Sequence, residues 1–506
     1  MRALIVYPNL PLMMTPPLSV ALFTSIAKSE GVEVDLFETT HYADTEENAQ
    51  SNKESFGAGR KVKNYVDAFE DVKPTSQAVS DFREHVLNTK PDFIFMSLVE
   101  DTFFDGIQLL QSIEDQNIPN LIGGVFPINA PYVCLERSEI DAICRFEGEY
   151  VFRDVIRDPD NYKNVDGIWC MVDGRIQTNP AQTLVKLDDF TPDYSLFDEK
   201  RFYRPIGGLA RKTVQLETYR GCPYSCTFCN SPTTRLMDKA YLRRKSLDVL
   251  RAEMEGLMKI NPEYWFIIDD AFTARPRKEL FKLLEVIKDF GLPWWCNTRL
   301  DDVDDEILAA MKEAHCDRIQ FGIESGNEEY RKNVLRRKVS QEKYLNVIET
   351  INKSDIPYGL NAIIGMPNET RSMVMETAKL CKQFGGYDGL GVSIFIPYHG
   401  TALRELAVSE GYLPYDNIGS PFGLQGKPIL DMPQPYLQKD EISELARKFK
   451  LYAFFDEEHW PEIDVATDLQ PWEDAYNKNF FYSSVAVSGH NRLQHYACSA
   501  DPYVEF

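Results

Sequence analysis

The sequence lacks any apolar run long enough to cross a membrane, and it contains no internal repeat or low-complexity tract. A transmembrane helix needs about 20 consecutive, mostly apolar residues. The apolar run that follows Met1 ends at Pro8 and is too short for a signal peptide. We therefore expect no membrane span and a cytoplasmic location.

The sequence also has fewer cationic than anionic residues. The 506 residues include 55 Lys and Arg against 78 Asp and Glu, which gives a formal net charge of −23. Proteins that bind nucleic acid, or the surface of an anionic membrane, normally offer a broad cationic surface. We expect no nucleic-acid partner. The hydrophobic fraction of 43% at this length predicts several folded domains rather than a disordered chain.

The ten cysteines lack the even spacing of a disulfide framework. In a reducing compartment, clustered cysteines indicate metal binding or catalysis, whereas isolated ones behave as small hydrophobic residues. Three of the ten are clustered. The scattered ones, which we expect to be buried, are Cys134, Cys144, Cys170, Cys296, Cys316, Cys381 and Cys498.

Hydrophobic periodicity divides the chain into four parts. Residues 1–157 alternate strand-like and helix-like segments and predict a Rossmann-like, doubly wound α/β domain, in which the polar stretch 41–75 is an insertion or loop. Residues 158–212 are expected to form a linker. Six further strand–helix units over 213–404 favour a partial (β/α)6 barrel, and the mixed, acidic residues 405–506 predict a helical and irregular C-terminal cap.

A cysteine motif follows the first strand of the predicted barrel. Cys222, Cys226 and Cys229 have CxxxCxxC spacing, so that one loop can present three thiolates to one metal centre. Thiolates suit both zinc and iron–sulfur clusters. A structural zinc site needs a fourth ligand, and no His or Cys lies close behind Cys229.

This segment resembles the radical S-adenosylmethionine (SAM) superfamily in both spacings, in Phe228 just before the third cysteine, and in its place after the first barrel strand. The resemblance implies that Cys222, Cys226 and Cys229 bind a 4Fe–4S cluster whose open iron chelates SAM. One-electron reduction would cleave SAM to methionine and a 5′-deoxyadenosyl radical, which abstracts hydrogen from a substrate. A reductant such as flavodoxin or ferredoxin is implied as a partner.

The resemblance also assigns SAM contacts to the ends of the next two strands. Asp269 or Asp270 is a candidate for holding the SAM amino group, with a helix N-cap as the alternative. Arg299 could pair with the SAM carboxylate or with an acidic substrate, and a surface ion pair is the alternative.

The last three strand ends of the barrel continue the resemblance. Glu324 matches the ribose-contacting segment, or else it is a barrel-floor acid tied to Arg or Lys. Backbone contact with adenine is implied near Ile363. Glu369 lies one residue later than the general family pattern, and His399 either acts at the substrate or is structural.

The N-terminal part resembles the cobalamin-binding domain fused to many radical SAM enzymes. The matching residues are Pro16-Pro17, the strand-ending Gly123-Gly124, and Glu147-Gly148-Glu149. Gly123 and Gly124 would permit close approach of the corrin. The Asp-x-His-x-x-Gly motif of other cobalamin proteins is missing, so no lower cobalt ligand is assigned, and the loop 97–101 could lie below the cobalt or contact the nucleotide tail.

These resemblances predict a cobalamin-dependent radical SAM enzyme that methylates an unactivated carbon of a small-molecule or peptide substrate. The same parts could instead catalyse cyclisation or rearrangement. A methylthiotransferase would need three more N-terminal cysteines and a basic C-terminal module, and a non-catalytic metal or cobalamin carrier is the third alternative. No catalytic side chain is assigned; candidates to line the substrate pocket are Trp460, Trp472, Tyr476 and His490.

Overall fold

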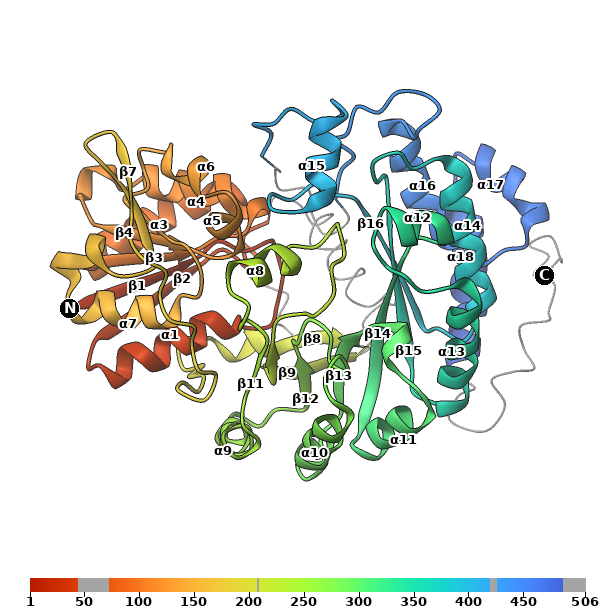
Figure 1. Cartoon of the computed structure of the whole chain (residues 1–506), viewed down its shortest axis with the longest axis horizontal. Helices are drawn as coiled ribbons and strands as arrows, with labels where there is room; N and C mark the ends of the chain where they lie inside the picture. Colours follow the sequence, from red (N-terminus) through yellow and green to blue (C-terminus); the bar gives the residue numbers. More distant parts are fainter. Residues whose placement is uncertain (44–71, 207–208, 419–425, 486–506) are drawn as a thin grey trace.

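The computed structural model describes residues 1–43, 72–206, 209–418 and 426–485 (Figure 1). For residues 478–485 only the helical backbone is described. Two seven-stranded sheets lie next to each other, the N-terminal one on the left of Figure 1 and the second in the centre. Most of the predicted insertion at 41–75 lies outside the described residues.

The N-terminal sheet begins with parallel strands in the order β2-β1-β3-β4-β5 and ends with the antiparallel hairpin β6–β7. This order is that of flavodoxin-like doubly wound folds, which confirms the predicted class and places the switch point, where ligands usually bind, between β1 and β3. The strands are β2 (Glu33–Glu38), β1 (Arg2–Tyr7), β3 (Phe93–Ser97), β4 (Asn120–Gly123), β5 (Ala142–Cys144), β6 (Ile168–Val172) and β7 (Arg175–Thr178).

Helices cover both faces of this sheet. Apolar residues of α1 and α7 pack on one face with Phe93 and Phe95, while those of α3 and α4 pack on the other with Ile94 and Met96. Both faces of a central strand are therefore buried, as expected for a doubly wound sheet. The helices are α1 (Leu18–Ser29), α3 (Thr75–Thr89), α4 (Phe103–Gln111), α5 (Val125–Asn129), α6 (Pro131–Leu135) and α7 (Glu149–Arg157).

The second sheet has the order β16-β15-β14-β13-β12-β9-β8, with β8 antiparallel and the rest parallel. Since β16 and β8 are its two edges, the sheet is an open, partial (β/α)6 barrel, as predicted. Its strands are β8 (Tyr203–Ile206), β9 (Leu209–Leu216), β12 (Tyr264–Ile267), β13 (Trp294–Thr298), β14 (Cys316–Glu324), β15 (Tyr358–Ile364) and β16 (Gly389–Ile394).

The helices that connect the barrel strands pack on the convex face of the sheet. On β15, Leu360 and Ala362 are buried in the core shared with these helices, whereas Asn361 between them is exposed on the concave side. The concave face is therefore open to a ligand. The helices are α9 (Leu247–Leu257), α10 (Arg277–Lys288), α11 (Asp305–Glu313), α12 (Glu328–Asn333), α13 (Gln341–Ser354) and α14 (Arg371–Phe384).

Both sheets extend into the stretch predicted as a linker, because β6 and β7 join the N-terminal sheet and β8 joins the barrel. The chain between them docks on the N-terminal domain. The Asp193 backbone N–H donates to the Ala21 carbonyl at 2.9 Å, and buried Arg201 pairs with Glu38 at 2.6 Å. Short 3-10 helices complete the connections: η2 (Glu100–Thr102), η3 (Glu114–Gln116), η4 (Pro159–Asn164), η5 (Glu199–Phe202), η6 (Met258–Ile260), η7 (Leu300–Asp302) and η8 (Glu457–His459).

The C-terminal part is helical in its described residues, and α16 packs against β16 and α14. Trp472 and Tyr476 are buried against Phe455 and Phe454, so these two aromatic residues belong to the core and do not line a pocket. His490 lies outside the described residues. The helices are α15 (Ala402–Ser409), α16 (Lys439–Tyr452), α17 (Trp460–Val465) and α18 (Gln470–Val485).

Candidate active site

The three clustered cysteines lie in the loop between β9 and α8 (Ser231–Met237), at the carboxyl end of the first parallel strand of the barrel. Cys222, Cys226 and Cys229 are partly exposed, whereas every other cysteine that the structure describes is buried. Phe228 is partly buried and packs against the barrel core. Exposure thus separates the motif from the cysteines that only fill space.

Nitrogen donors face two of these sulfurs. The Ser231 backbone N–H donates to Cys229 Sγ at 3.4 Å, and Arg299 Nη1 lies 3.7 Å from Cys226 Sγ. Burial raises the pKa of Cys222 to about 12 and also raises the pKa of Cys229. Without a cation these thiols stay protonated; metal binding would supply the charge that makes them thiolates.

These thiols fit an iron–sulfur cluster in number, loop position and access. Among the described residues, no three His, Cys, Asp or Glu side chains converge as ligands of a single metal ion. In a 4Fe–4S cluster each cysteine binds its own iron, which requires the thiolates to lie farther apart than ligands of one ion. Nearby N–H groups are the kind of donor that tunes such a cluster.

Asp269, two residues after β12, has a structural role. Its carboxylate accepts hydrogen bonds from the backbone N–H groups of Thr218 and Tyr219 at 2.7 and 3.0 Å, and it pairs with Arg275 at 2.5 Å. Its side chain is fully buried. Asp269 therefore fastens β12 to the segment that leads into the cysteine loop, and it has no carboxylate oxygen left for SAM.

Asp270 has a different environment, although it is the next residue. Its side chain is exposed and accepts a hydrogen bond from the Ser231 hydroxyl at 3.1 Å. Desolvation by the surrounding loop raises the pKa of Asp270. Of the two predicted acids, Asp270 is the one that remains available beside the cysteine loop.

Arg299, after β13, is buried rather than part of a surface ion pair. Its guanidinium pairs with Asp301 at 2.9 Å and lies 3.9 Å from the centroid of the Tyr224 ring in the cysteine loop. The same group reaches Cys226, as described above. Arg299 therefore lies beside the cysteine loop as a fixed nitrogen donor.

Glu324, at the end of β14, is buried and pairs with Arg337 at 2.9 Å. Arg337 also donates to the Gly322 carbonyl at 2.6 Å. Burial raises the pKa of Glu324, and Arg337 opposes that shift. Glu324 has φ of 60°, a strained value for a residue with a side chain, and such strain tends to occur at functional sites.

At the end of β15 no charged side chain of the two predicted residues, Ile363 and Glu369, faces the concave side of the sheet. Ile363 is partly buried on the concave side of the sheet. Glu369 turns back into its own loop and accepts from the backbone N–H groups of Gly365 and Met366 at 2.6 and 3.2 Å. Complete burial raises the pKa of Glu369 to about 8. Glu369 thus closes the loop and does not face a ligand.

The two glycines after β4 play different parts. Gly124 has φ of 102°, and a Cβ there would lie 2.3 Å from the Leu98 carbonyl oxygen. A Cβ on Gly123 would meet nothing closer than 3.8 Å. Position 124 therefore requires glycine, because the backbone of the loop after β3 lies too close for a Cβ. Gly123 leaves room at the edge of the sheet.

Apolar side chains are exposed at this edge, next to the β1/β3 switch point. Val99 after β3 is 43% exposed and Val125 after β4 is 49% exposed. Neither residue carries an atom that could ligate a metal. An exposed apolar surface at a ligand edge suits a flat, largely apolar macrocycle.

The next two residues of the β3 loop connect this edge to the barrel. Glu100 accepts from the His399 backbone N–H at 2.9 Å and lies 2.9 Å from His399 Nδ1. Tyr398 donates to Asp101 at 2.8 Å, and Asn230, beside the third cysteine, donates to the His399 carbonyl at 2.6 Å. His399 therefore links the two ligand edges structurally.

Sequence reasoning missed a group of charges beside the cysteine loop. Glu147 and Glu149, whose motif suggested a cofactor domain, pair with Arg220 at 3.1 and 2.8 Å. Glu147 also pairs with Arg243. Opposite charges beside two predicted motifs were the available signal, but the residues are too far apart in sequence for spacing to join them.

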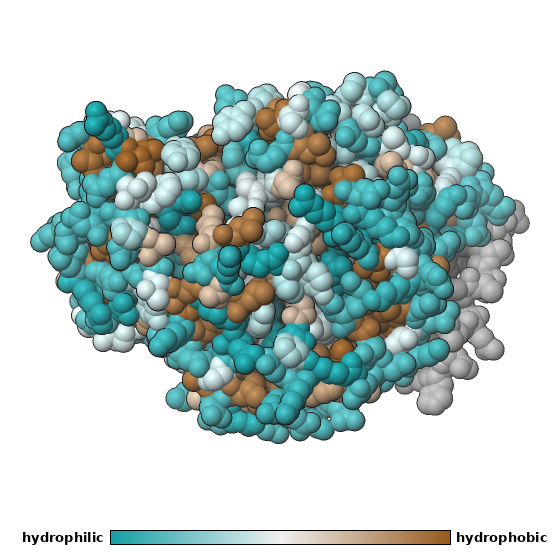
Figure 2. Space-filling model, in the orientation of Figure 1, coloured by the Kyte–Doolittle hydropathy of each residue, from teal (hydrophilic) through white to brown (hydrophobic). Residues whose placement is uncertain are grey.

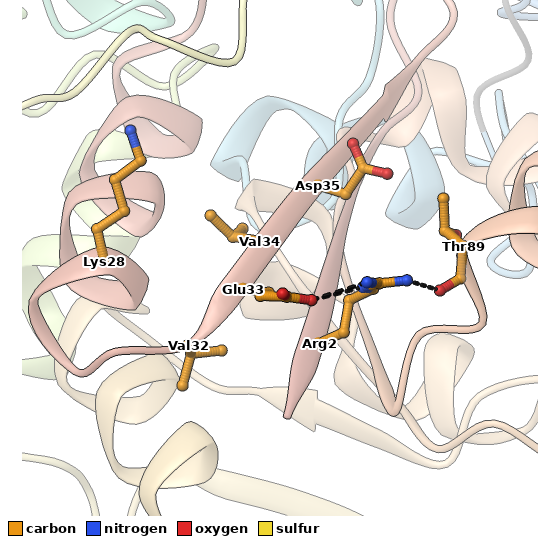
Figure 3. Close-up of a pocket in the computed structure, with 7 residues that line it drawn as sticks. All are labelled: Arg2, Lys28, Val32, Glu33, Val34, Asp35 and Thr89. Atoms are coloured by element: carbon orange, nitrogen blue, oxygen red, sulfur yellow. Dashed lines mark hydrogen bonds and ion pairs between the residues drawn. The ribbon is translucent and has the colours of Figure 1, made fainter.

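A hollow of about 500 Å³ lies away from these residues, at the amino end of β1 and β2 (Figure 3). Arg2 crosses it, pairing with Glu33 at 2.8 Å and donating to the Thr89 carbonyl. Ligands of doubly wound sheets bind at the opposite, carboxyl edge. We therefore assign no role to this hollow.

Within the described residues, no helix is both long and apolar enough to span a membrane. Figure 2 shows one face of the molecule, on which hydrophilic residues predominate and small apolar patches lie between them.

Comparisons with known proteins agree with the site. Residues 216–381 match the sequence model of the Radical SAM superfamily, and this range contains the cysteine loop and β12 to β15. These residues thus form a radical SAM domain within the chain.

Its overall fold is similar to that of two cobalamin-dependent radical SAM enzymes. The radical SAM methyltransferase TsrM from Kitasatospora setae, solved with cobalamin and a 4Fe-4S cluster bound, matches with a TM-score of 0.63 and 15% identity, over 90% of this chain and 89% of TsrM. The cobalamin-dependent radical enzyme OxsB, solved with aqua-cobalamin and SAM, matches with a TM-score of 0.65 and 15% identity, over 96% of this chain and 70% of OxsB.

Relatives found by sequence align with only part of this chain and with only part of their own length. The anaerobic magnesium-protoporphyrin IX monomethyl ester cyclase of Rubrivivax gelatinosus is 26% identical over 64% of this chain, and the alignment spans 60% of that relative. The cytidylyl-2-hydroxyethylphosphonate methyltransferase of Streptomyces wedmorensis is 25% identical over 71% of this chain and 74% of that relative.

Proposed function

We propose that this chain is a cobalamin-dependent radical SAM enzyme that methylates an unactivated carbon. The observation that carries the proposal is the partly exposed trio Cys222, Cys226 and Cys229 at the carboxyl end of β9, in a chain whose other described cysteines are buried. The N-terminal sheet supports it with an apolar ligand edge tied to the barrel loops.

In this proposal Cys222, Cys226 and Cys229 hold a 4Fe–4S cluster, and Arg299 Nη1 lies 3.7 Å from the sulfur of Cys226. When bound, the cluster and SAM supply one-electron chemistry and cobalamin supplies a methyl group. Asp270 faces the same mouth and is the acid available to hold the SAM amino group. Glu324, locked by Arg337, shapes the barrel at the end of β14.

We propose that cobalamin binds at the β1/β3 switch point. Exposed Val99 and Val125 support it by offering an apolar surface, and Gly123 supports it by leaving the edge uncrowded. The barrel side of this site is bounded by the loop after β16, which Glu100 and Asp101 fix through His399 and Tyr398.

The proposed substrate is a small molecule or peptide held on the concave face of the barrel. A flavodoxin or ferredoxin is the proposed electron donor, because SAM cleavage consumes one electron. We place the protein in the cytoplasm, where a reducing environment keeps cysteines as thiols.

The test is anaerobic reconstitution of the full chain with iron and sulfide, followed by hydroxocobalamin binding and gel filtration. We expect about four irons per chain and a broad absorbance near about 400 nm, together with retained cobalamin. Methylation predicts both S-adenosylhomocysteine and 5′-deoxyadenosine among the products. A reconstituted chain that binds no cluster contradicts the proposal.

Cyclisation is the second candidate, favoured by the alignment with the Rubrivivax gelatinosus cyclase. It uses the same radical parts but transfers no methyl group. Production of 5′-deoxyadenosine without S-adenosylhomocysteine would favour it over methylation. Cluster binding without cobalamin retention would instead indicate a cobalamin-independent radical SAM enzyme.

A further inference from the structure

Arg220 lies two residues before Cys222, and carboxylates from both halves of the molecule hold its guanidinium. Glu217 of the barrel pairs with Nε at 2.8 Å. Glu149 of the N-terminal domain pairs with Nη2 at 2.8 Å, and Glu147 pairs with Nη1 at 3.1 Å. The Arg220 side chain is 15% exposed, so these pairs are only weakly screened by solvent.

A second arginine completes the arrangement. Arg243 lies on β11 (Arg243–Arg244), which pairs with β10 (Tyr219–Arg220), so the two arginines occupy neighbouring strands. Arg243 Nη1 donates to Glu147 Oε2 at 2.9 Å and to the Val185 carbonyl at 2.6 Å. Glu147 also accepts from the Val185 backbone N–H at 2.8 Å, so every contact of its carboxylate is fixed.

The connection from Arg220 to the first cysteine is short and stiff. Gly221 has φ of 97°, and a Cβ there would lie 2.9 Å from Tyr241, so the turn is packed against its neighbour. Arg235 of α8 donates to the Cys222 carbonyl at 2.9 Å. A displacement of Arg220 would therefore be passed on to the backbone of Cys222.

We propose that Arg220 is a positioning residue for the cysteine loop and that the N-terminal domain sets its orientation through Glu147 and Glu149. The inference rests on the proposed function, in which that loop holds the iron–sulfur cluster. The Glu-Gly-Glu motif then serves to hold the cobalamin domain and the cluster loop at one fixed separation. Removing one carboxylate takes away a hydrogen bond that orients the Arg220 guanidinium, and lysine in its place cannot reach all three carboxylates at once; either change loosens the loop.

A merely structural role predicts a different outcome, and the chain offers a matched control. Glu38 and Arg201 form another ion pair between the N-terminal domain and the segment before the barrel, at 2.6 Å, with side chains 18% and 1% exposed. Within the part of the chain that the structure describes, this pair does not touch the cysteine loop. Glu38→Gln should therefore cost stability without changing the loop.

The experiment compares Glu147→Gln, Glu149→Gln and Arg220→Lys with Glu38→Gln in the full chain. In protein without iron, hydrogen exchange of residues 219–230 should be about tenfold faster in the first three and unchanged in the control. After reconstitution, the reduced cluster should show an altered electron paramagnetic resonance spectrum, and the dissociation constant for SAM should rise about tenfold, as for other outer residues of metal sites.

The proposal is overturned if folded Glu147→Gln and Arg220→Lys keep the wild-type exchange rate and spectrum, or if Glu38→Gln changes them equally. If Glu147→Gln does not fold, Glu149→Gln replaces it in this comparison. A wild-type chain that takes up no cluster contradicts the proposed function, whereas the exchange measurement in iron-free protein still decides the role of Arg220.

Discussion

The two sheets have the same number of strands but differ in what covers them. In the N-terminal sheet, the central strand β3 is buried along nearly its whole length, on both faces. In the barrel sheet, buried and accessible residues alternate along β13. The first sheet has helices on both faces, whereas the helices that connect the barrel strands pack on one face of the second.

This difference decides where each sheet can carry function. A sheet buried on both faces can meet a ligand only through the loops at its edge. A curved sheet with an open concave face can use strand residues as well. Hence the ligand surface of the N-terminal domain is limited to loop residues such as Val99 and Val125, while the barrel can also use Asn361 and Ile363.

The largest expected effect concerns the cysteine loop. Replacing Cys222, Cys226 or Cys229 with Ala should reduce the iron content from about four per chain to near zero. Cys381→Ala, at a fully buried packing position, should keep the iron and lower the free energy of unfolding by about 1–2 kcal/mol. Iron analysis and absorbance test this, and iron retained in any loop variant would contradict it.

Substitutions at neighbouring residues of a central strand test whether one or both faces of each sheet are buried. In β3, Phe95→Ala and Met96→Ala should each cost about 2–5 kcal/mol, since both side chains are buried. In β15, Leu360→Ala should cost as much, whereas Asn361→Ala should cost less than about 0.5 kcal/mol. Urea unfolding midpoints measure these effects. Equal losses at 360 and 361 would mean that the concave face is not open.

The edge of the N-terminal sheet can be tested through its two glycines. Gly124→Ala places a Cβ against the Leu98 carbonyl in a left-handed backbone conformation, so it should cost about 1–3 kcal/mol. Gly123→Ala makes only an ordinary contact and should cost less than about 1 kcal/mol. Thermal unfolding compares the two variants. A larger loss at 123 would contradict the assignment of close approach to Gly124.

The last expected effect is a pH dependence from the loop after β15. The pKa of Glu369 is about 8 in the folded chain, against 4.5 for a free carboxyl. Between these values the unfolded chain releases a proton that the folded chain keeps, so stability falls as the pH rises across this window. Glu369→Gln should flatten the melting temperature between about pH 5 and about pH 8. An unchanged slope would contradict the shifted pKa.

Sequence patterns predicted the two sheets well, because their strands are defined by local chemistry. Phe93–Ser97 is a short apolar run of the kind that becomes a buried parallel strand, and the six strand–helix units of the barrel recur regularly. The cysteine loop was predicted for the same reason, since all three cysteines lie within one short segment.

Long-range pairing could not be predicted from spacing. Arg243 and Glu147 are 96 residues apart, and only the folded chain brings their charges together. Asp269 and Asp270 formed one candidate in the sequence, yet in the loop after β12 one is buried against Thr218 and Arg275 and the other is exposed beside Ser231. Pockets that form from distant segments, such as the substrate site, share this limitation.

The helix α1 has a consequence for how the protein is made. Its first half, including Leu18 and Leu22, packs in the same core as Tyr194, Val214 and other barrel residues, while Ile26 belongs to the core of the N-terminal sheet. At a synthesis rate of about 5–20 residues per second, roughly 10–40 seconds pass before residue 214 follows Leu22. During that interval an apolar stripe on the nascent chain lacks its final partner, which is the situation in which chaperones are needed.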